Sequence, residues 1–300
     1  MIKSEKIFLR KLINKYTKEE ALKKKYPLTS NPFETQDIIK AAETLLSGRI
    51  TMSSITKKFE KEFAKFIGAK HALMVNSGSS ANLLAFFALT NPENKQRIKP
   101  NDECIIPAIC WSTSLWPIVQ AGLKPKFIDV DPKNFNLNLN ILEKNITKKT
   151  KAILAVHILG NSTNMKKLMD LVRKKNLTLI EDSCESLGSI YKNKYLGTFG
   201  KYGTYSFYVS HQITSGEGGM IVCNNTKDYR IIHALRAHGW DRGLLKKNKN
   251  DFNFINSGFN LRPLDLTAAI GLSQLKRLKN MMKIRKQNRN LIIKKIKSSI

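Results

Sequence analysis

The first third of the chain places apolar residues at the spacing of amphipathic helices. This spacing predicts a helix over 34–46 that ends near Gly48, a residue type that commonly follows the last helical turn. It predicts a second helix over 56–66, whose core-facing side carries Phe59, Phe63 and Phe66. Both helices should therefore pack on a common core.

Charged helices are expected toward the two ends of the chain. Residues 2–25 should form a helix that packs loosely on the main body, with a break at the prolines of 27–32. A helix over 228–238 and a polar loop over 239–256 follow the middle of the chain. Residues 267–300 are expected to form one long, lysine-rich helix.

Between residues 71 and 223, short apolar runs alternate with helical segments. The predicted strands are 71–75, 103–107, 125–130, 151–156, 177–180, a short aromatic strand from 204, and 220–223. Helical segments are predicted over 83–89, after 109 and over 164–175, with a loop over 131–142. Such alternation predicts an α/β fold, in which a mostly parallel sheet carries helices on both faces.

Composition limits the class of protein. A chain of 300 residues with 42% hydrophobic content can form one large domain, or one large and one partial domain. An excess of 52 basic over 23 acidic residues gives a net charge of +29, which favours either a nucleic-acid binder or a compositional bias. The basic residues are scattered and accompany no nucleic-acid module, so we favour the bias and expect no nucleic-acid partner.

The cysteines and the apolar runs bear on the compartment. Cys104, Cys110, Cys184 and Cys223 lack C-x-x-C spacing, which predicts reduced thiols without a metal site or a disulfide. No apolar run approaches the roughly 18 residues that span a bilayer, and the N-terminus lacks the apolar region of a signal peptide. We therefore expect a cytoplasmic protein without a membrane partner.

Two segments carry candidate chemistry. After the strand at 71–75, the small residues of 76–82 would expose backbone N–H groups at a helix N-terminus, which is a ready anion site. A plain serine-rich helix cap is the alternative reading of the same residues. Residues 204–219 read as a strand, a polar turn and a glycine-rich exit, which would place side chains at the mouth of an α/β sheet.

Residues 204–219 resemble the active-site motif of the DegT/DnrJ/EryC1/StrS sugar aminotransferases, a branch of the fold-type I pyridoxal phosphate (PLP) enzymes. That motif is S-F-x-x-x-K-x-[IL]-x-x-G-E-G-G, and its lysine forms a Schiff base with the cofactor. Here Ser206 and the glycines to Gly219 match, while His211 stands in the place of the lysine. The resemblance covers about residues 31–278 and implies an aspartate aminotransferase-like fold.

The resemblance implies how PLP or pyridoxamine phosphate (PMP) is held. Gly78 and Ser79 match the family's phosphate-binding turn S-G-[ST]-x-A, and Ser206 would help to hold the cofactor. Trp111 aligns with the aromatic residue that stacks on the pyridine ring, whereas Trp116 is expected in the core.

Further positions follow from the same resemblance. Asp182 matches the acid that pairs with the protonated ring nitrogen, although an aspartate at a strand end more often caps a helix. Glu185 falls beside the ring hydroxyl, where relatives often carry Gln. Asn260 lies in a G-x-N-x-R-like segment that reaches the phosphate in the neighbouring subunit, which implies a homodimer with shared sites. For His157, a family landmark, a site role and a structural role are equally open.

Histidine at the lysine position changes the expected chemistry. Imidazole has no primary amine, so His211 cannot bind the cofactor covalently. A free imidazole titrates near pH ~6.5, so His211 is expected to act as the catalytic acid–base on non-covalently held PMP. Lys201, the nearest lysine, lies ten residues upstream and is expected on the wrong side of the strand.

The Lys-to-His exchange is similar to that of the nucleotide-sugar 3-dehydratases in deoxysugar and surface-polysaccharide biosynthesis. The resemblance implies that glutamate aminates the cofactor and that a 4-keto-6-deoxy nucleotide sugar loses its C3 hydroxyl, with release of ammonia. No cysteine cluster for an iron–sulfur centre follows Gly219, which favours a GDP-linked sugar and no metal. A nucleotide-sugar aminotransferase and a non-catalytic homologue are the alternatives.

The domain boundaries also follow from this reading. Residues 1–30 are expected to be an N-terminal helical segment and residues 31–265 the large PLP-binding domain. Residues 266–300 are expected to lead into a smaller C-terminal domain, of which this chain would hold only the beginning.

Overall fold

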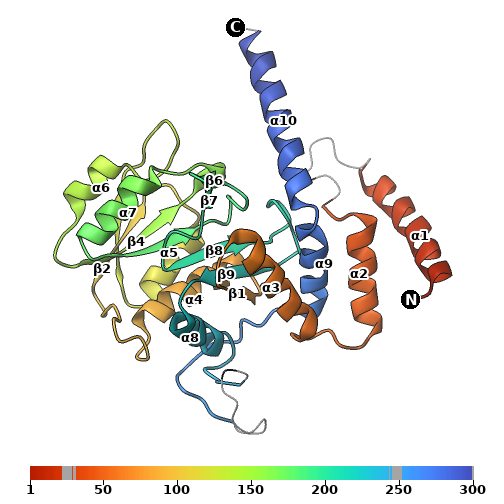
Figure 1. The fold of residues 1–300 in the computed structure, drawn as a ribbon, viewed down its shortest axis with the longest axis horizontal. Helices are drawn as coiled ribbons and strands as arrows, with labels where there is room; N and C mark the ends of the chain where they lie inside the picture. Colours follow the sequence, from red (N-terminus) through yellow and green to blue (C-terminus); the bar gives the residue numbers. More distant parts are fainter. Residues whose placement is uncertain (22–28, 30–31, 243, 245–251, 299–300) are drawn as a thin grey trace.

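The computed structural model describes residues 1–21, 29, 32–242, 244 and 252–298 (Figure 1). Most of the predicted break at 27–32, the end of the predicted helix 2–25 and the middle of the predicted loop 239–256 lie outside the described residues.

A seven-stranded sheet forms the centre of the molecule, in the order β1-β9-β8-β5-β4-β2-β3. Its strands are β1 His71–Val75, β2 Glu103–Pro107, β3 Lys124–Ile128, β4 Thr150–Val156, β5 Thr178–Asp182, β8 Tyr202–Ser206 and β9 Gly219–Cys223. Neighbouring strands pair in parallel except at β9, which is antiparallel to both β1 and β8. The predicted, mostly parallel α/β sheet is therefore confirmed.

Helices cover both faces of this sheet (Figure 1). They are α1 Lys3–Ala21, α2 Thr35–Leu46, α3 Ser54–Ile67, α4 Gly78–Thr90, α5 Ser112–Gln120, α6 Leu139–Asn145, α7 Met165–Lys174, α8 Thr226–Arg236, α9 Asp265–Leu275 and α10 Leu278–Lys297. Alternate strand residues face opposite sides, so one apolar core forms against α4, α5 and α8. On the other face, α3 and α9 cover one end of the sheet, and α6 and α7 cover the other.

The start of α3 is completed by a residue from much later in the chain. The carboxylate of Asp265, at the start of α9, accepts hydrogen bonds from the backbone amides of Ser53, Ile55 and Thr56 at 2.7, 3.1 and 2.9 Å. These amides belong to the group that a helix N-terminus leaves without internal partners. The side chain of Asp265 therefore caps α3 from another helix.

Two secondary-structure predictions were wrong, and one element was not predicted. The predicted loop 131–142 gives way to α6, because Asn138 caps that helix by accepting from the amides of Asn140 and Ile141. The predicted single helix 267–300 is two helices, α9 and α10, that meet at Arg277, whose guanidinium is bound to α2. A hairpin, β6 Ile190–Tyr191 with β7 Lys194–Tyr195, was not predicted.

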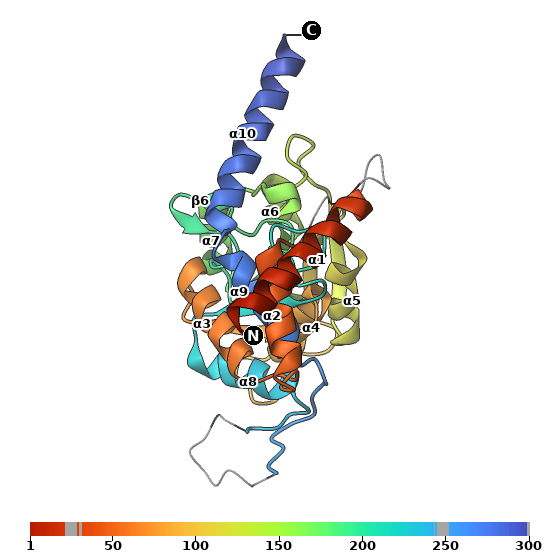
Figure 2. The ribbon, with the colours of Figure 1, turned by 90° about the vertical axis from the view of Figure 1, so that its right-hand side faces the viewer.

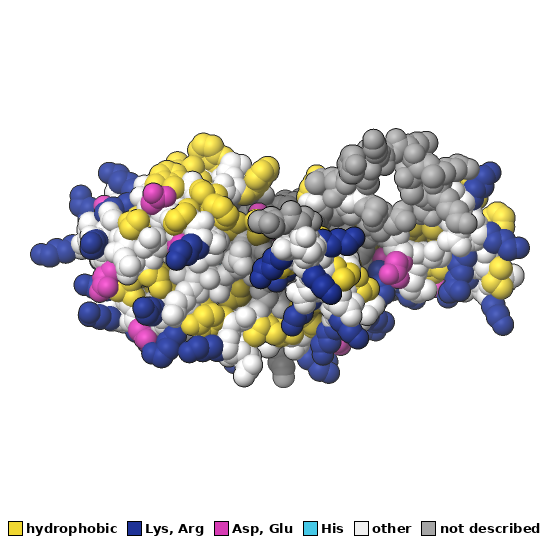
Figure 3. All heavy atoms as spheres, turned by 90° about the horizontal axis from the view of Figure 1, so that it is seen from above, with side chains coloured by type: hydrophobic (Ala, Val, Ile, Leu, Met, Phe, Trp, Pro, Cys, Tyr) yellow, Lys and Arg dark blue, Asp and Glu magenta, His cyan; other side chains and the backbone are white. Residues whose placement is uncertain are grey.

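The two charged helices lie at the edge of the molecule. Helix α1 packs against α2, where the ammonium of Lys6 lies 2.6 Å from the carboxylate of Glu43 (Figure 2). Helix α10 extends away from the body, with several exposed apolar side chains along it. Lys and Arg side chains are spread over the face in Figure 3 rather than gathered in one patch. In the described part of the chain, no helix is long and apolar enough to cross a membrane.

Candidate active site

Asp182 lies at the carboxyl end of β5 and is held by three segments. Its Oδ2 accepts hydrogen bonds from Asn82 Nδ2 of α4 at 2.8 Å and from Ser114 Oγ of α5 at 2.7 Å. Its Oδ1 accepts from the Cys184 amide at 3.2 Å. The carboxylate is buried, and its partners fix its orientation. It therefore serves as an oriented anion at the strand edge and does not cap a helix.

Asn82 and Ser114 were not predicted as site residues. Thr204 of β8 donates to Asn82 Oδ1 at 2.6 Å, so Asn82 links β8 to Asp182. The sequence shows that each is a polar residue in a largely apolar helix, and the structure adds that each is buried where that helix packs on the sheet. Buried polar side chains of this kind need partners, which here are one another and Asp182.

The predicted anion site lies at the N-terminus of α4. Ser77 caps this helix, since its Oγ accepts from the Ser80 amide at 3.1 Å. A Cβ on Gly78 would lie 2.6 Å from the Cβ of Ser206, so only glycine allows this close approach. The Ser79 hydroxyl donates to Thr113 Oγ1 at 2.9 Å. The structure therefore brings Gly78, Ser79 and Ser206 together, and the first amides of α4 suit an anion.

Trp111 and Trp116 are both exposed. Trp111 stands just before α5 and is 72% exposed, so its ring faces are open to a ligand. Trp116, which was expected in the core, is 51% exposed in this chain. That prediction was wrong because Trp116 lies on the side of α5 opposite the buried Ser114 and Ile118.

His211 lies in the turn between β8 and β9. Its backbone amide donates to the Tyr208 carbonyl at 3.1 Å, and its ring lies edge-on to the Tyr208 ring, with centroids 6.3 Å apart. Burial lowers the pKa of His211, while the carboxylates of Glu185 and Asp182 act in the opposite direction. The half-buried imidazole is therefore neutral near pH 7 and lies close enough to both carboxylates to be influenced by them.

Glu185 connects the His211 turn to the end of β4. Its Oε2 accepts from the Leu159 amide at 2.8 Å, and its carbonyl accepts from Gln212 Nε2. Leu159 itself adopts a left-handed φ of 52°. The turn and Glu185 are therefore joined by direct contact.

Lys201 lies at the far end of β8 from His211. Its Nζ is 3.0 Å from the Asp228 carboxylate of α8, and its amide donates to the Leu179 carbonyl. Since Lys201 precedes β8 and His211 follows it, the strand separates the two side chains. This placement confirms that Lys201 is on the wrong side of the strand to replace the missing lysine.

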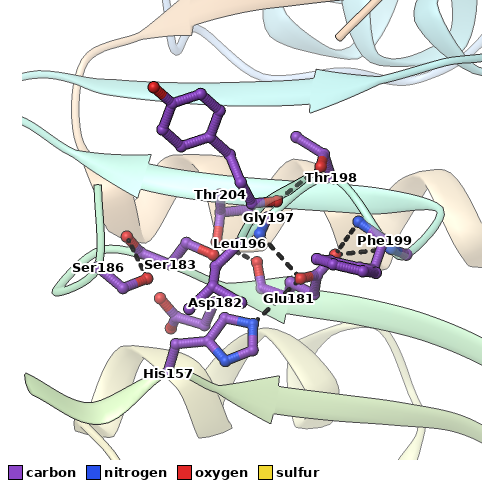
Figure 4. Close-up of polar contacts among 12 residues, drawn as sticks. His157, Glu181, Asp182, Ser183, Ser186, Leu196, Gly197, Thr198, Phe199 and Thr204 are labelled. Atoms are coloured by element: carbon purple, nitrogen blue, oxygen red, sulfur yellow. Dashed lines mark hydrogen bonds and ion pairs between the residues drawn. The ribbon is translucent and has the colours of Figure 1, made fainter. Parts of the chain in front are cut away.

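A second buried carboxylate, Glu181, lies beside Asp182 (Figure 4). It accepts hydrogen bonds from the amides of Gly197, Phe199 and Gly200 at 2.8, 2.6 and 2.6 Å. The Nε2 of His157 lies 3.1 Å from its Oε1. The ring of His157 is 1% exposed, and the His157 amide donates to the Asp182 carbonyl at 3.0 Å. His157 therefore has a structural role, in tying β4 to β5.

The side chain of Asn260 bonds to a neighbouring arginine in its own segment. Its Oδ1 accepts from Arg262 Nε at 2.9 Å, and it lines a cleft of about 1110 Å³ between α3 and α8. None of the other predicted site residues lines this cleft. Its neighbour Leu261 lies beside the start of the α4 turn, since its carbonyl accepts from the Asn76 amide at 3.1 Å.

Comparison with known proteins identifies relatives along most of the chain. A sequence model of the DegT/DnrJ/EryC1/StrS aminotransferase family matches residues 32–299. The GDP-4-keto-6-deoxy-D-mannose 3-dehydratase of Escherichia coli O55:H7 (strain CB9615 / EPEC) is 40% identical over 284 residues, which are 91% of this chain and 73% of that protein.

Solved structures give the same result. A GDP-4-keto-6-deoxymannose-3-dehydratase with a trapped PLP-glutamate geminal diamine has a TM-score of 0.87 at 40% identity, over 91% of this chain and 73% of that one. A variant of a dehydratase of the same name, with bound GDP-perosamine, has a TM-score of 0.86 at 40% identity, with the same coverage. These matches confirm the predicted fold class.

Proposed function

The chain belongs to the DegT/DnrJ/EryC1/StrS aminotransferase family, and we propose that it removes the C3 hydroxyl of a 4-keto-6-deoxy nucleotide sugar. The observation that carries this proposal is the half-buried imidazole of His211 where the family motif has its lysine. The candidate substitute, Lys201, is paired with Asp228 at the other end of β8. The turn therefore supplies an acid–base group, the imidazole, and no lysine amine that could form a Schiff base with the cofactor.

The arranged residues fit PLP or PMP. When bound, PMP supplies an amine that condenses with the keto group and a ring that accepts electrons. The α4 N-terminus at Gly78 and Ser79, with the Ser206 hydroxyl against it, suits the phosphate. The fixed anion of Asp182 suits the protonated ring nitrogen, and the open face of Trp111 suits stacking on the ring.

His211 is the proposed acid–base catalyst. Because burial lowers its pKa, the imidazole is ready near pH 7 to accept a proton from the methylene carbon of PMP. The imidazolium then faces the carboxylates of Glu185 and Asp182, which stabilise it until it donates to the departing C3 hydroxyl. Glu185 is thus proposed to act both beside the ring hydroxyl and on His211.

The substrates follow from the named relatives and the assembly from Asn260. A GDP-linked sugar is favoured, with glutamate as the amino donor, because the relatives described above act on or hold such molecules. Asn260 lies in the G-x-N-x-R-like segment that reaches the phosphate of the neighbouring subunit in the family, so we propose a homodimer in which Asn260 of the partner subunit contacts the cofactor phosphate.

One assay tests the proposed reaction. The complete protein is incubated with PLP, glutamate and a panel of 4-keto-6-deoxy nucleotide sugars, and the products are analysed by mass spectrometry. We expect a sugar that has lost the C3 oxygen and carries no nitrogen, together with ammonia and 2-oxoglutarate. A sugar that gains nitrogen would identify an aminotransferase instead, and no reaction with any sugar would contradict both.

A further inference from the structure

The turn that carries His211 is bound by side chains of two helices, α9 and α10. The Thr214 amide donates to Gln274 Oε1 of α9 at 2.9 Å, and Arg285 Nη2 of α10 reaches the His211 carbonyl at 3.4 Å. The Thr214 hydroxyl donates to the Phe207 carbonyl at 2.9 Å, which closes the turn on β8. Gln274 is therefore a buried contact between this turn and a helix 60 residues further along the chain.

The other end of the Gln274 amide is bound to the N-terminal part of the chain. Its Nε2 donates to the Pro32 carbonyl at 2.8 Å and to Asp37 Oδ2 of α2 at 3.2 Å. The side chain of Asp37 is fully buried and receives two parallel bonds of 2.9 Å from the guanidinium of Arg277. The amide therefore links α2, α9 and the catalytic turn.

This arrangement gives the amide a single orientation. The anion of Asp37 and the Pro32 carbonyl both accept hydrogen bonds, so the amide NH2 group must face them. Its Oε1 is then left toward the Thr214 amide, which is a donor. Because the side chain is only 1% exposed, water does not offer an alternative partner at this point.

We propose that Gln274 is a positioning residue, which holds the His211 turn in the position and orientation that proton transfer by the imidazole requires. The part of this inference that concerns turnover rests on the proposed function of His211. A displacement of about 1 Å in a reacting group can cost ~10²-fold in rate. Loss of the Thr214 contact, three residues from His211, is expected to produce a displacement of this kind.

The test compares Gln274→Met with Gln36→Met, the same change at an exposed glutamine of α2. For Gln274→Met we expect kcat to fall ~10-fold or more while KM stays within about twofold. The acid limb of the pH–rate profile should move to higher pH, because a looser turn hydrates the imidazole and returns its pKa toward the ordinary value. Gln36→Met should leave all of these unchanged.

NMR titration of isotope-labelled histidine in the protein without substrate provides a readout that does not depend on the reaction. In Gln274→Met the His211 pKa should rise. If it stays constant while only the unfolding temperature falls, Gln274 is merely structural and the proposal is wrong. If Gln274→Met does not fold, Gln274→Asn serves, since it keeps an amide for Asp37 but is one methylene too short to reach the Thr214 amide as well. An unchanged His211 pKa there would likewise overturn the proposal. If the sugar assay failed, the proposed reaction would be wrong, but the titration would still test whether Gln274 positions His211.

Discussion

Two neighbouring carboxylates on β5 have different surroundings: one belongs to the candidate active site and the other makes structural contacts. Asp182 points to the face of α4 and α5, where two side chains orient it. Glu181 points to the opposite face, where three backbone amides and His157 surround it (Figure 4). Because Glu181 is bound by backbone amides of residues 197–200, it holds that turn in place. Asp182 is bound by two side chains and presents a fixed charge at the end of β5. The alternation of the strand assigns the two roles.

The largest expected effect lies on the Asp182 face. His211→Asn should lower dehydration by ~10²–10⁴-fold, because an acid–base group is lost, and should leave thermal unfolding unchanged. His211→Lys should also lose dehydration but gain the yellow absorbance of a lysine-bound cofactor, and borohydride should trap that link. In the unmodified protein no lysine, Lys201 included, should be trapped. Near-native dehydration by His211→Asn would contradict the proposed mechanism.

Asp182→Asn removes the charge on the same face of β5. The amide keeps the shape and can still accept from Ser114, but it supplies no charge to a protonated ring nitrogen. We expect turnover to fall on the order of 10²-fold, as when one preorganised electrostatic group is removed, with PLP bound more weakly. Absorbance titration with PLP and thermal unfolding would be measured together. If Asp182→Asn lowered the unfolding temperature but kept the turnover rate of the parent, Asp182 would have the structural role that is assigned here to Glu181.

Glu181→Gln should give the opposite result. Its NH2 group would face the amides of Phe199 and Gly200, so donors would meet donors in a buried place. We expect a loss of about 3–5 kcal/mol in the free energy of unfolding, as for a broken buried charge network. Chemical denaturation measures this loss. The folded fraction should keep kcat within severalfold, and a selective loss of activity at unchanged stability would contradict the assignment.

Asn260→Ala should have the smallest effect of the four, since it removes one neutral contact to a phosphate. We expect PLP affinity to fall ~10-fold, consistent with one hydrogen bond to a charged group, while the unfolding temperature stays close to that of the parent. Sedimentation would establish the oligomeric state in parallel. A fully active monomer would contradict the shared site.

The sequence indicated those parts of the site that depend on local pattern. Ser206 and Asp182 end β8 and β5, and Gly78 begins α4, and all three were identified because they match short motifs of the family that the chain resembles. Asn82 and Ser114 were missed because their role depends on which face of a helix meets the sheet. The interruption between α9 and α10 was missed because Arg277 is bound by Asp37, which is 240 residues away and has no trace in the local pattern. Trp116 was misplaced because aromatic content alone does not indicate the buried face.

The cap that Asp265 provides for α3 has a consequence for folding during synthesis. The first turn of α3 and the pairing of β1 with β9 both join residues near 50–75 to residues near 219–265. While the ribosome makes the intervening residues, the apolar side of α3 and an edge of β1 lack their final partners. Contacts of such high sequence separation slow folding and leave nascent chains open to association. The N-terminal quarter of the molecule should thus consolidate late, and chaperone engagement should concentrate on nascent chains shorter than about residue 265.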